Sequence, residues 1–577
     1  MNYKNNVDMK GRGRLASLLL VAAILLLAVP AKAQEAAVPK WGSKVQKGMV
    51  SVVSYDKDGN QLKSGTGFYI SNDGIAIADY ELFYGAYSAI VSDMNGKKNK
   101  VERILGANDT YSLVRFKVAT EKSVALECAP SKAQEGAVLF AMKYSSDKVK
   151  TCPTTRVNEA KAVGEPPFPF YTLSFAIDES YLGAPLLNAK GQVVATVQPS
   201  IGLNGYGLGI QFIDTLKIQA IASQMNNLAL DNIHMPKGLP DNLEESLVYL
   251  YIKSSTMKDD EYLDLTNLFV KTYPDNAEGY YRRATPLIDL AQFDEADRDL
   301  QQYYKLSEDK AVANSRIADI IFTKLVYQPT PEYSKWNYDV ALEYIDKAIE
   351  LSPNELNYTL MKSRILMAKK DYSGALAIYD KLNKSENRGP STFYAAALAH
   401  EGLGDTATIQ IELLDSAIAL FPTPLPGEAA SYILRRGQLH ERVGHYRDAV
   451  QDYNQYAFLC NSKVNAKFYY DKSKLEVKAR MYQQALDDLN TAINKAPGTV
   501  LYYVEKSGLL LRVNEIDECI AAAQQALEIA PDNADAYRIM GYAQIQKGDV
   551  EAGKKSLQKA IDLGDEMSKE LIKDYIK

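Results

Sequence analysis

The sequence predicts a multidomain protein in which an all-β N-terminal half is followed by an all-α solenoid. Three observations predict this. With 577 residues, the chain exceeds the size at which a single hydrophobic core stops growing, so at least two domains are expected. Between residues 43 and 223, short apolar runs alternate with glycine-containing turns. Beyond residue 240, apolar residues follow helical spacing and recur with a period of about 34 residues.

Residues 1–33 have the parts of a secretory signal peptide. Four basic residues precede an apolar run at 15–29, and residues 31–33 form an A-x-A cleavage site. The alternative is an uncleaved anchor, but a membrane span needs about 20 apolar residues and this run is shorter. No cysteine follows it, which excludes lipid attachment there, and no other segment is apolar and long enough to span a bilayer. We therefore expect export, to the periplasm or outside the cell, and no membrane span after cleavage.

The mature chain is expected to be acidic. Cleavage after residue 33 removes five basic side chains and one acid, so the formal net charge moves from −6 to −10. A negative protein repels phosphate backbones, which argues against nucleic acid as a partner.

Turn signals divide residues 43–223 into short strands. The apolar run at 50–53 is followed by an Asp-Gly step at 58–59, and the run at 67–70 by another at 73–74. Such a step between apolar runs is a strong hairpin signal. Many short strands without a long amphipathic helix indicate a closed or paired barrel.

Three segments of this half resemble the trypsin-like proteases of the HtrA class. Residues 64–74 resemble the segment G-[ST]-G-F-x-I-S-x-D-G, residues 176–177 and 183–194 resemble A-I-N-x-G-N-S-G-G-P-L-L-N-x-x-G-x-V-V-G, and residues 206–213 resemble the later G-x-G-F-A-I strand. The three occur in the family's order across roughly 180 residues. The resemblance implies a double β-barrel and, in an active member, a Ser-His-Asp triad.

All three catalytic positions differ from what the resemblance implies. The histidine is due seven residues after Gly74, where this chain has Glu81. Ser112 stands at the aspartate position and Leu182 at the serine position. Leu182 is best interpreted as an apolar plug in the former cleft, and Glu81 as an exposed or salt-bridged carboxylate. We therefore predict a pseudoprotease, with no catalytic residue at these degenerate positions.

The histidine count tests this without an alignment. The histidines are His234, His400, His440 and His445, so residues 1–233 contain none. Ser180 lies two residues before the nucleophile position and is an alternative nucleophile, with a lysine as its base. However, the loop that forms the oxyanion hole is also changed, because Ser180, Tyr181 and Ala184 replace Gly, Asn and Gly of the motif.

A repeated helical pattern begins beyond a predicted linker at 224–240. An aromatic or aliphatic residue is followed three positions later by a small one and four positions after that by an apolar one. Successive copies begin 36, 34 and 34 residues apart, at Tyr446, Tyr482, Ile516 and Val550. Prolines end the second helices at Pro353, Pro422, Pro497 and Pro531.

This pattern resembles the tetratricopeptide repeat (TPR). We expect eight or nine repeats over 241–565, with an inserted loop at 327–337, and a polar capping helix at 566–577. Stacked helix pairs form a curved array whose first helices line the concave face, so the resemblance implies a partner-binding groove there. The positions that resemble groove-lining sites are Tyr281, Leu434, Tyr470, Val504, Arg538 and Tyr542.

No metal or cofactor site is predicted. His440 and His445 are five residues apart, whereas ligand pairs on one helix need a spacing of three or four, and no third ligand converges in the sequence. Cys128 and Cys152 share the β-rich half, and a bridge between them stays open because sequence gives no Cα separation. Cys460 and Cys519 lie two repeats apart and are expected to be free.

These observations favour an exported scaffold or adaptor that binds other exported or envelope proteins, through peptide segments, and has no chemistry of its own. The runner-up is an active but atypical serine endopeptidase whose repeats recruit substrate. A third hypothesis makes the barrel domain a peptide binder that keeps the old substrate cleft. The sequence leaves the partner and the oligomeric state open.

Overall fold

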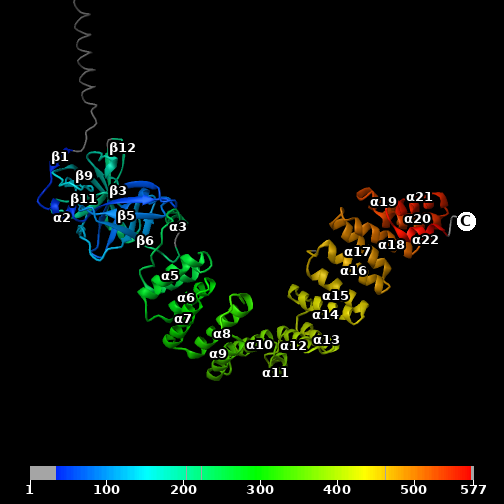
Figure 1. The fold of residues 1–577 in the computed structure, drawn as a ribbon. Helices are drawn as coiled ribbons and strands as arrows, with labels where there is room; N and C mark the ends of the chain where they lie inside the picture. The colour runs from blue at the N-terminus through cyan, green and yellow to red at the C-terminus, as the bar shows by residue number, and fades with distance from the viewer. Residues whose placement is uncertain (1–33, 203, 222–223, 462, 574–577) are drawn as a thin grey trace, which may run out of the picture. The chain divides into compact units, whose positions relative to one another are not determined.

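The structure is a computed structural model that describes residues 34–202, 204–221, 224–461 and 463–573. The predicted signal peptide lies outside the described residues. The chain divides into two compact units, the first ending at Glu308 and the second comprising Asp309–Lys577. Each unit is described by itself; in Figure 1 the first is coloured from blue to green and the second from green to red.

The first unit opens with a closed six-stranded antiparallel barrel of strand order β2-β3-β4-β7-β6-β5. Strand β5 pairs back with β2, which closes the ring. The predicted Asp-Gly steps at 58–59 and 73–74 lie in the turns that follow β2 and β3. The strands are β2 (Met49–Tyr55), β3 (Gln61–Tyr69), β4 (Ile75–Asp79), β5 (Ser88–Ser92), β6 (Lys98–Asn108) and β7 (Leu113–Val118).

A second antiparallel ring follows, of order β8-β9-β10-β13-β12-β11, in which β11 pairs back with β8. One further strand, β1 (Gln34–Ala37), pairs with β9, so the barrel region begins before the predicted residue 43. The ring strands are β8 (Val138–Ala141), β9 (Thr151–Val163), β10 (Phe168–Leu173), β11 (Pro185–Leu187), β12 (Val193–Ile201) and β13 (Asn204–Gly209). The predicted double β-barrel is therefore confirmed.

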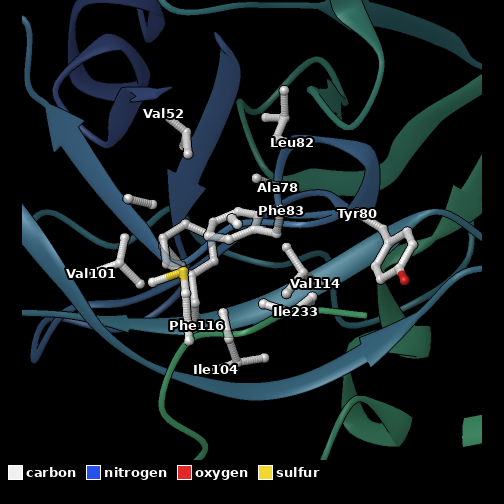
Figure 2. Packing of buried hydrophobic residues seen from close by; sticks show 14 of the residues in the cluster. Val52, Ala78, Tyr80, Leu82, Phe83, Val101, Ile104, Val114, Phe116 and Ile233 are labelled. Atoms are coloured by element: carbon white, nitrogen blue, oxygen red, sulfur yellow. The ribbon is translucent and has the colours of Figure 1, made fainter. Parts of the chain in front are cut away.

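Alternating burial explains why the strands of the first barrel pair in these registers. Along β2, Val50, Val52 and Ser54 are fully buried while Ser51 and Val53 between them are half-buried, as a strand with one face on a core requires. The rings of Phe83 and Phe116 pack in the centre with centroids 4.9 Å apart. Figure 2 shows these side chains together with Ile233, which reaches the same core from beyond the strands.

Residues 224–240, predicted to be a linker, are packed on the first barrel from Ala229 onward. Ile233 is 1% exposed within the barrel core. The N–H of Ile104 donates to the carbonyl of Pro236, and the N–H of Gly238 donates to the carbonyl of Ile104, both at 2.8 Å. The apolar residues between the prolines supply this contact, which turn composition alone does not reveal.

Lys237, within the same segment, is half-buried, and its ammonium is held against the backbone. Its ammonium donates to the carbonyl oxygens of Ile233 and Met235. Burial lowers the pKa of Lys237 to about 8. The segment is therefore not an exposed joint, and the domain limits drawn from sequence remain predictions.

Two of the helices that follow, at 243–253 and 259–272, share a core with this segment. Ile218 packs with Leu250 and Phe269. Arg103 of β6 forms a two-pronged ion pair with Asp264, at 2.6 and 2.7 Å. The α-helices of the first unit are α2 (Gly42–Gln46), α3 (Gln224–Asp231), α4 (Leu243–Lys253), α5 (Asp259–Thr272), α6 (Ala277–Asp289) and α7 (Phe293–Leu306).

The second unit contains helices alone among its described residues. They are α8 (Lys310–Tyr327), α9 (Tyr338–Leu351), α10 (Leu356–Lys369), α11 (Tyr372–Asn383), α12 (Pro390–Leu403), α13 (Ala407–Ala419), α14 (Ala430–Arg442), α15 (Tyr446–Leu459), α16 (Ala466–Lys478), α17 (Tyr482–Lys495), α18 (Val500–Arg512), α19 (Ile516–Ile529), α20 (Ala534–Lys547), α21 (Val550–Asp562) and α22 (Glu566–Lys573). Counted along the described chain, α4 to α21 make nine consecutive helix pairs, and α22 follows them.

Small residues sit where the paired helices approach most closely. A Cβ placed on Gly541 of α20 would lie 2.9 Å from the carbonyl oxygen of Gly553 in α21, so neither position tolerates a larger side chain without movement. The side-chain carbonyls of Asn465 and Asn533 accept hydrogen bonds at the starts of α16 and α20, which satisfies otherwise unpaired N–H groups. The predicted loop at 327–337 connects α8 to α9.

Two sequence questions are answered by the described residues. Throughout the described ranges, no helix combines the length and apolar character needed to cross a bilayer. All four cysteines are unpaired in the structure. Burial raises the pKa of the Cys128 and Cys152 thiols to about 11, which keeps them protonated and unreactive near neutral pH.

Candidate functional site

Glu81, at the position expected for a histidine base, lies in a short 3-10 helix (Tyr80–Leu82) after β4. Its carboxylate forms an ion pair with Lys63 at 2.7 Å, and both side chains are about half exposed, at 59% and 47%. Exposed pairs of this kind contribute little to stability. Glu81 is therefore an ordinary surface carboxylate, as the sequence analysis expected.

Asp79, which the sequence analysis did not single out, is the buried acid of this region. It is 6% exposed and accepts hydrogen bonds from the N–H of Glu81 at 2.8 Å and from the hydroxyl of Ser112 at 3.2 Å. Burial raises the pKa of Asp79, against the opposing effect of those two donors. The sequence does contain a signal for this buried acid: Asp79 ends the apolar strand β4, directly before a turn.

Gly183 brings the second barrel against Asp79. Its φ is +72°, and a Cβ placed on it would lie 2.6 Å from the backbone nitrogen of Asp79. The structure thus brings the segment that follows Leu182 together with Ser112 and with the turn that carries Glu81. The Leu182 side chain itself packs on the core of the second barrel, together with residues such as Leu186 and Val197.

The backbone N–H groups of residues 180–184 all donate within the protein. The N–H of Ser180 donates to the Asp178 carboxylate at 2.9 Å. The next two donate to the carbonyls of Asp178 and Glu179 at 2.9 and 3.0 Å, and those of residues 183 and 184 donate to Val197 and Tyr181 at 3.0 and 2.9 Å. An oxyanion hole needs N–H groups that point at the substrate. In this conformation the loop offers none from these five residues.

Ser180 has one neighbour that could activate it. The Lys143 ammonium donates to the Ser180 hydroxyl at 2.6 Å and also lies 4.6 Å from the centre of the Tyr181 ring. Beside them is a cavity of about 420 Å³, which Lys143 and Tyr181 help to line. The pairing has the residue types of a Ser/Lys dyad, but Ser180 is exposed and Lys143 only half-buried, whereas a lysine base is normally desolvated.

A second candidate surface lies on the last helix pairs. Val504 and Arg538 line a cavity of about 380 Å³ between α16, α18 and α20. Arg538 and Tyr542 also line a neighbouring, largely apolar cavity of about 500 Å³ whose far wall is Leu571 of α22. Because the two cavities share Arg538 and Ile539, they form one continuous surface, which we call the C-terminal groove.

The other predicted groove residues have different places. Tyr470 does not line either cavity. Its hydroxyl donates a hydrogen bond of 3.3 Å to the carboxylate of Glu505, and Glu505 lines the first cavity. Tyr281 lies in the first unit, where its ring packs at a tilt against the ring of Tyr303, with centroids 5.1 Å apart. Leu434 is half-buried in α14 and lines none of the cavities described here. Of the six predicted positions, Val504, Arg538 and Tyr542 share one hollow.

The sequence argument against a metal at His440 and His445 rested on the lack of a third ligand. The structure overturns that reason, because Asp448 lies beside both histidines. The spacing rule applied to one helix, whereas these residues come from two helices and the turn between them.

Comparison with known proteins finds the tetratricopeptide repeat family model at residues 335–390 and again at 534–563. The DnaJ protein P58IPK homolog B of Oryza sativa subsp. japonica is 22% identical over 307 residues, which are 52% of this chain and 59% of that protein. The DnaJ protein P58IPK homolog of Arabidopsis thaliana is 22% identical over 309 residues, 53% and 58% of the two chains. The chain thus spans less than two thirds of the length of these relatives.

Among solved structures, the active form of the Rv3671c protease from M. tuberculosis matches with 18% identity and a TM-score of 0.27, covering 32% of this chain and 91% of that one. An inactive mutant form of the same protein matches with 19% identity and a TM-score of 0.26, covering 31% and 92%. The fold class expected from the sequence is present: two six-stranded β-barrels, followed by a helical array that contains tetratricopeptide repeats.

Proposed function

We propose that this protein is an exported interaction scaffold, in which a catalytically inactive trypsin-like domain is joined to repeats that bind peptide segments of other exported or envelope proteins. The main support for inactivity is the hydrogen bonding of the backbone N–H groups of residues 180–184. All five N–H groups of the oxyanion loop are already used, so a tetrahedral intermediate would find no donor there.

Three further features support the inactivity. Residues 1–233 contain no histidine to act as the base. The Ser112 hydroxyl is committed to Asp79, and the Leu182 side chain is committed to the second barrel's core. Each former catalytic position therefore has a structural partner.

An activity-based probe tests this part. We expect no labelling of the full chain by a fluorophosphonate and no cleavage of an unfolded protein substrate. The variant Leu182→Ser should stay inactive, since a serine without a base is a weak nucleophile. Labelling that is lost in Ser180→Ala would refute the proposal.

The second candidate function is an atypical serine peptidase, favoured by the 2.6 Å contact between Lys143 and Ser180. It predicts a definite pattern: labelling should fall in both Ser180→Ala and Lys143→Met, but persist in Lys148→Met, a lysine that lines the same cavity. The absence of labelling in every variant and in the parent chain would remove this candidate.

The C-terminal groove is the proposed binding site for partners. Its apolar wall includes Leu511, Ile539 and Leu571, and Tyr542 adds an aromatic face. Lys474 and Arg512 line the first cavity, as do the acids Glu505 and Asp535. A hollow with apolar walls and charges of both signs fits an extended, partly apolar peptide better than a purely acidic tail.

Peptides selected from a random displayed library on the full chain provide a probe for the groove. The double variant Val504→Ala and Tyr542→Ala should weaken the selected peptides by about thirtyfold, equivalent to about 2 kcal/mol for a removed aromatic anchor. The matched control is Val312→Ala with Tyr327→Ala in α8, two residues that are 38% and 71% exposed and line neither cavity. Equal affinity of both double variants would move the site elsewhere.

Export is part of the same proposal. Cleavage between residues 33 and 34 would leave strand β1, which begins at Gln34, intact. We expect the mature protein to begin at Gln34 and to appear outside the cytoplasm on fractionation. A full-length N-terminus recovered from the cytoplasmic fraction would contradict it.

A further inference from the structure

Three metal-binding side chains meet at the turn between α14 and α15. His440 lies in the last turn of α14, His445 directly precedes α15, and Asp448 lies in the first turn of α15. Each offers one ligand atom, and these atoms all lie within 4.8 Å of one another. No other group of three such residues gathers in this way among the described residues.

The turn geometry explains why a spacing of five residues brings the histidines together. Gly444 has a φ of +82°, the left-handed conformation that closes a helix end. The N–H of His445 then donates to the carbonyl of His440 at 2.9 Å. The chain reverses within this turn, and the two imidazole rings face each other with centroids 5.8 Å apart. Asp448 follows His445 by three residues, which places both on one face of α15.

The local polar groups are available for a ligand. The Nδ1 atom of His440 is buried and has no hydrogen-bond partner in the described part of the chain. A buried polar atom without a partner is uncommon and calls for a reason. Asp448 is exposed, and no lysine or arginine of the described residues forms an ion pair with it. A cation would therefore meet two imidazoles and an uncommitted carboxylate.

We propose that His440, His445 and Asp448 bind one divalent transition-metal ion, and that Zn²⁺ is the ion that this donor set fits. Two imidazole nitrogens and one carboxylate oxygen are established zinc ligands, and a water completes a tetrahedral site. Ligand atoms around such an ion lie roughly 3.3 Å apart, since each metal–ligand bond is about 2.1 Å long. The exposed side chains of His445 and Asp448 close the difference by rotating inward.

The bound ion links the end of α14 to the start of α15. Because its ligands come from both sides of the turn, the ion adds a cross-link between the two helices beside the peptide chain that connects them. Anything that binds the folded state and not the unfolded one raises stability. Zinc therefore stabilises this helix pair, and the ion keeps one coordination position open to solvent.

The test is a calorimetric titration of Zn²⁺ into the full chain, produced without a histidine tag. One saturable site is expected. His440→Ala and His445→Ala should abolish zinc binding at this site. Asp448→Asn should weaken the zinc affinity by more than about tenfold, because losing a residue that only hydrogen-bonds to a metal ligand already costs about that much. The control is His400→Ala, because His400 also lies beside an acid, 2.8 Å from Asp405, but outside the cluster. This control should bind zinc as the parent does.

Two further measurements test whether the variants fold and which side chains hold the metal. Far-ultraviolet circular dichroism must show that each variant keeps its helicity, and the conservative Asp448→Asn variant answers the question if an alanine variant does not fold. Cobalt substitution should give tetrahedral d–d bands without a thiolate charge-transfer band, which separates this site from cysteine binding. Unsaturable binding, binding that is unchanged in all three variants, or a thiolate band would overturn the proposal.

Discussion

Replacement of Glu476 by glutamine should remove a large part of the pH dependence of the helical array. Glu476 in α16 is 1% exposed, and Lys472 and Asp488 beside it are 5% and 8% exposed. The Lys472 ammonium lies 2.8 Å from Asp488 and 3.4 Å from Glu476. One buried cation thus faces two acids. Burial, and then the charge of Asp488, raise the pKa of Glu476 to about 8.

The magnitude follows from proton linkage. The ordinary pKa of a glutamate is 4.5, so between about pH 4.5 and 8 the folded chain holds a proton on Glu476 that the unfolded chain has lost. Stability from this group is fully present below pH 4.5 and falls as pH rises, by about 1.4 kcal/mol per pH unit within the window. From pH 5.5 to 7.5 the parent chain should lose roughly 2–3 kcal/mol through this one carboxyl group.

Glutamine mimics the protonated acid and keeps a donor for Asp488. The melting temperatures of parent and Glu476→Gln should therefore coincide only below about pH 4.5. Between pH 5.5 and 7.5 the advantage of the variant should grow by about 5 °C or more, the shift that a further 2–3 kcal/mol produces in a unit of this size. Thermal unfolding followed by circular dichroism at 222 nm, a wavelength that reports helix, measures it. Glu528→Gln, at an exposed position of α19, is the control. Equal pH slopes for parent and Glu476→Gln would refute the reasoning.

The first unit supplies further predictions. Gly183→Ala should destabilise the double barrel by about 2 kcal/mol or more, because the new Cβ meets Asp79 and the φ of +72° strains any side chain; near-ultraviolet circular dichroism during urea unfolding measures this, and an unchanged midpoint would contradict it. Arg103→Ala removes the ion pair with Asp264, so amide exchange in α5 should become faster while exchange in β3 does not. Limited trypsin digestion should leave the bond after Lys237 intact, since its ammonium is held by two backbone carbonyls and the flanking backbone pairs with Ile104; early cleavage there would restore the predicted linker.

Much of the fold could be predicted because it depends on local signals. The Asp-Gly steps at 58–59 and 73–74 mark real hairpin ends, and small residues such as Gly553 mark real helix contacts. The family motifs implied two barrels before any strand pairing was known. These features are local, or they repeat, and a single sequence is enough to display both.

The parts that were not predicted depend on contacts between distant residues. The packing of residues 229–239 was missed because prolines and glycine there have the composition of a linker, while Ile233 reaches a core formed more than a hundred residues earlier. The role of Asp79 depends on Ser112 and Gly183, which come from a later strand turn and from the other barrel.

The candidate sites divide in the same way. Positions Glu81, Ser112 and Leu182 could be located by motif, but their partners could not. The convergence of His440, His445 and Asp448 was missed because the spacing rule describes one helix, and a left-handed residue at Gly444 turns the chain between two. The groove positions were chosen one by one from the repeat pattern, and only three of them share a hollow, because neighbouring side chains decide where the surface is open.

The hydrogen-bonded contact of Asp79 with Ser112, and its close approach to Gly183, also bear on how this chain can evolve. On the proposed function, a return to catalysis needs a histidine at 81, an aspartate at 112 and a serine at 182 together. An aspartate at 112 alone would set a second carboxylate against Asp79, whose oxygen is already 3.2 Å from the Ser112 hydroxyl. That single step would therefore cost stability, because two carboxylates at this distance repel each other. Under the proposed inactivity, the substitution at 112 also gives no catalysis without the other two, so selection for activity would have nothing to favour in that first step.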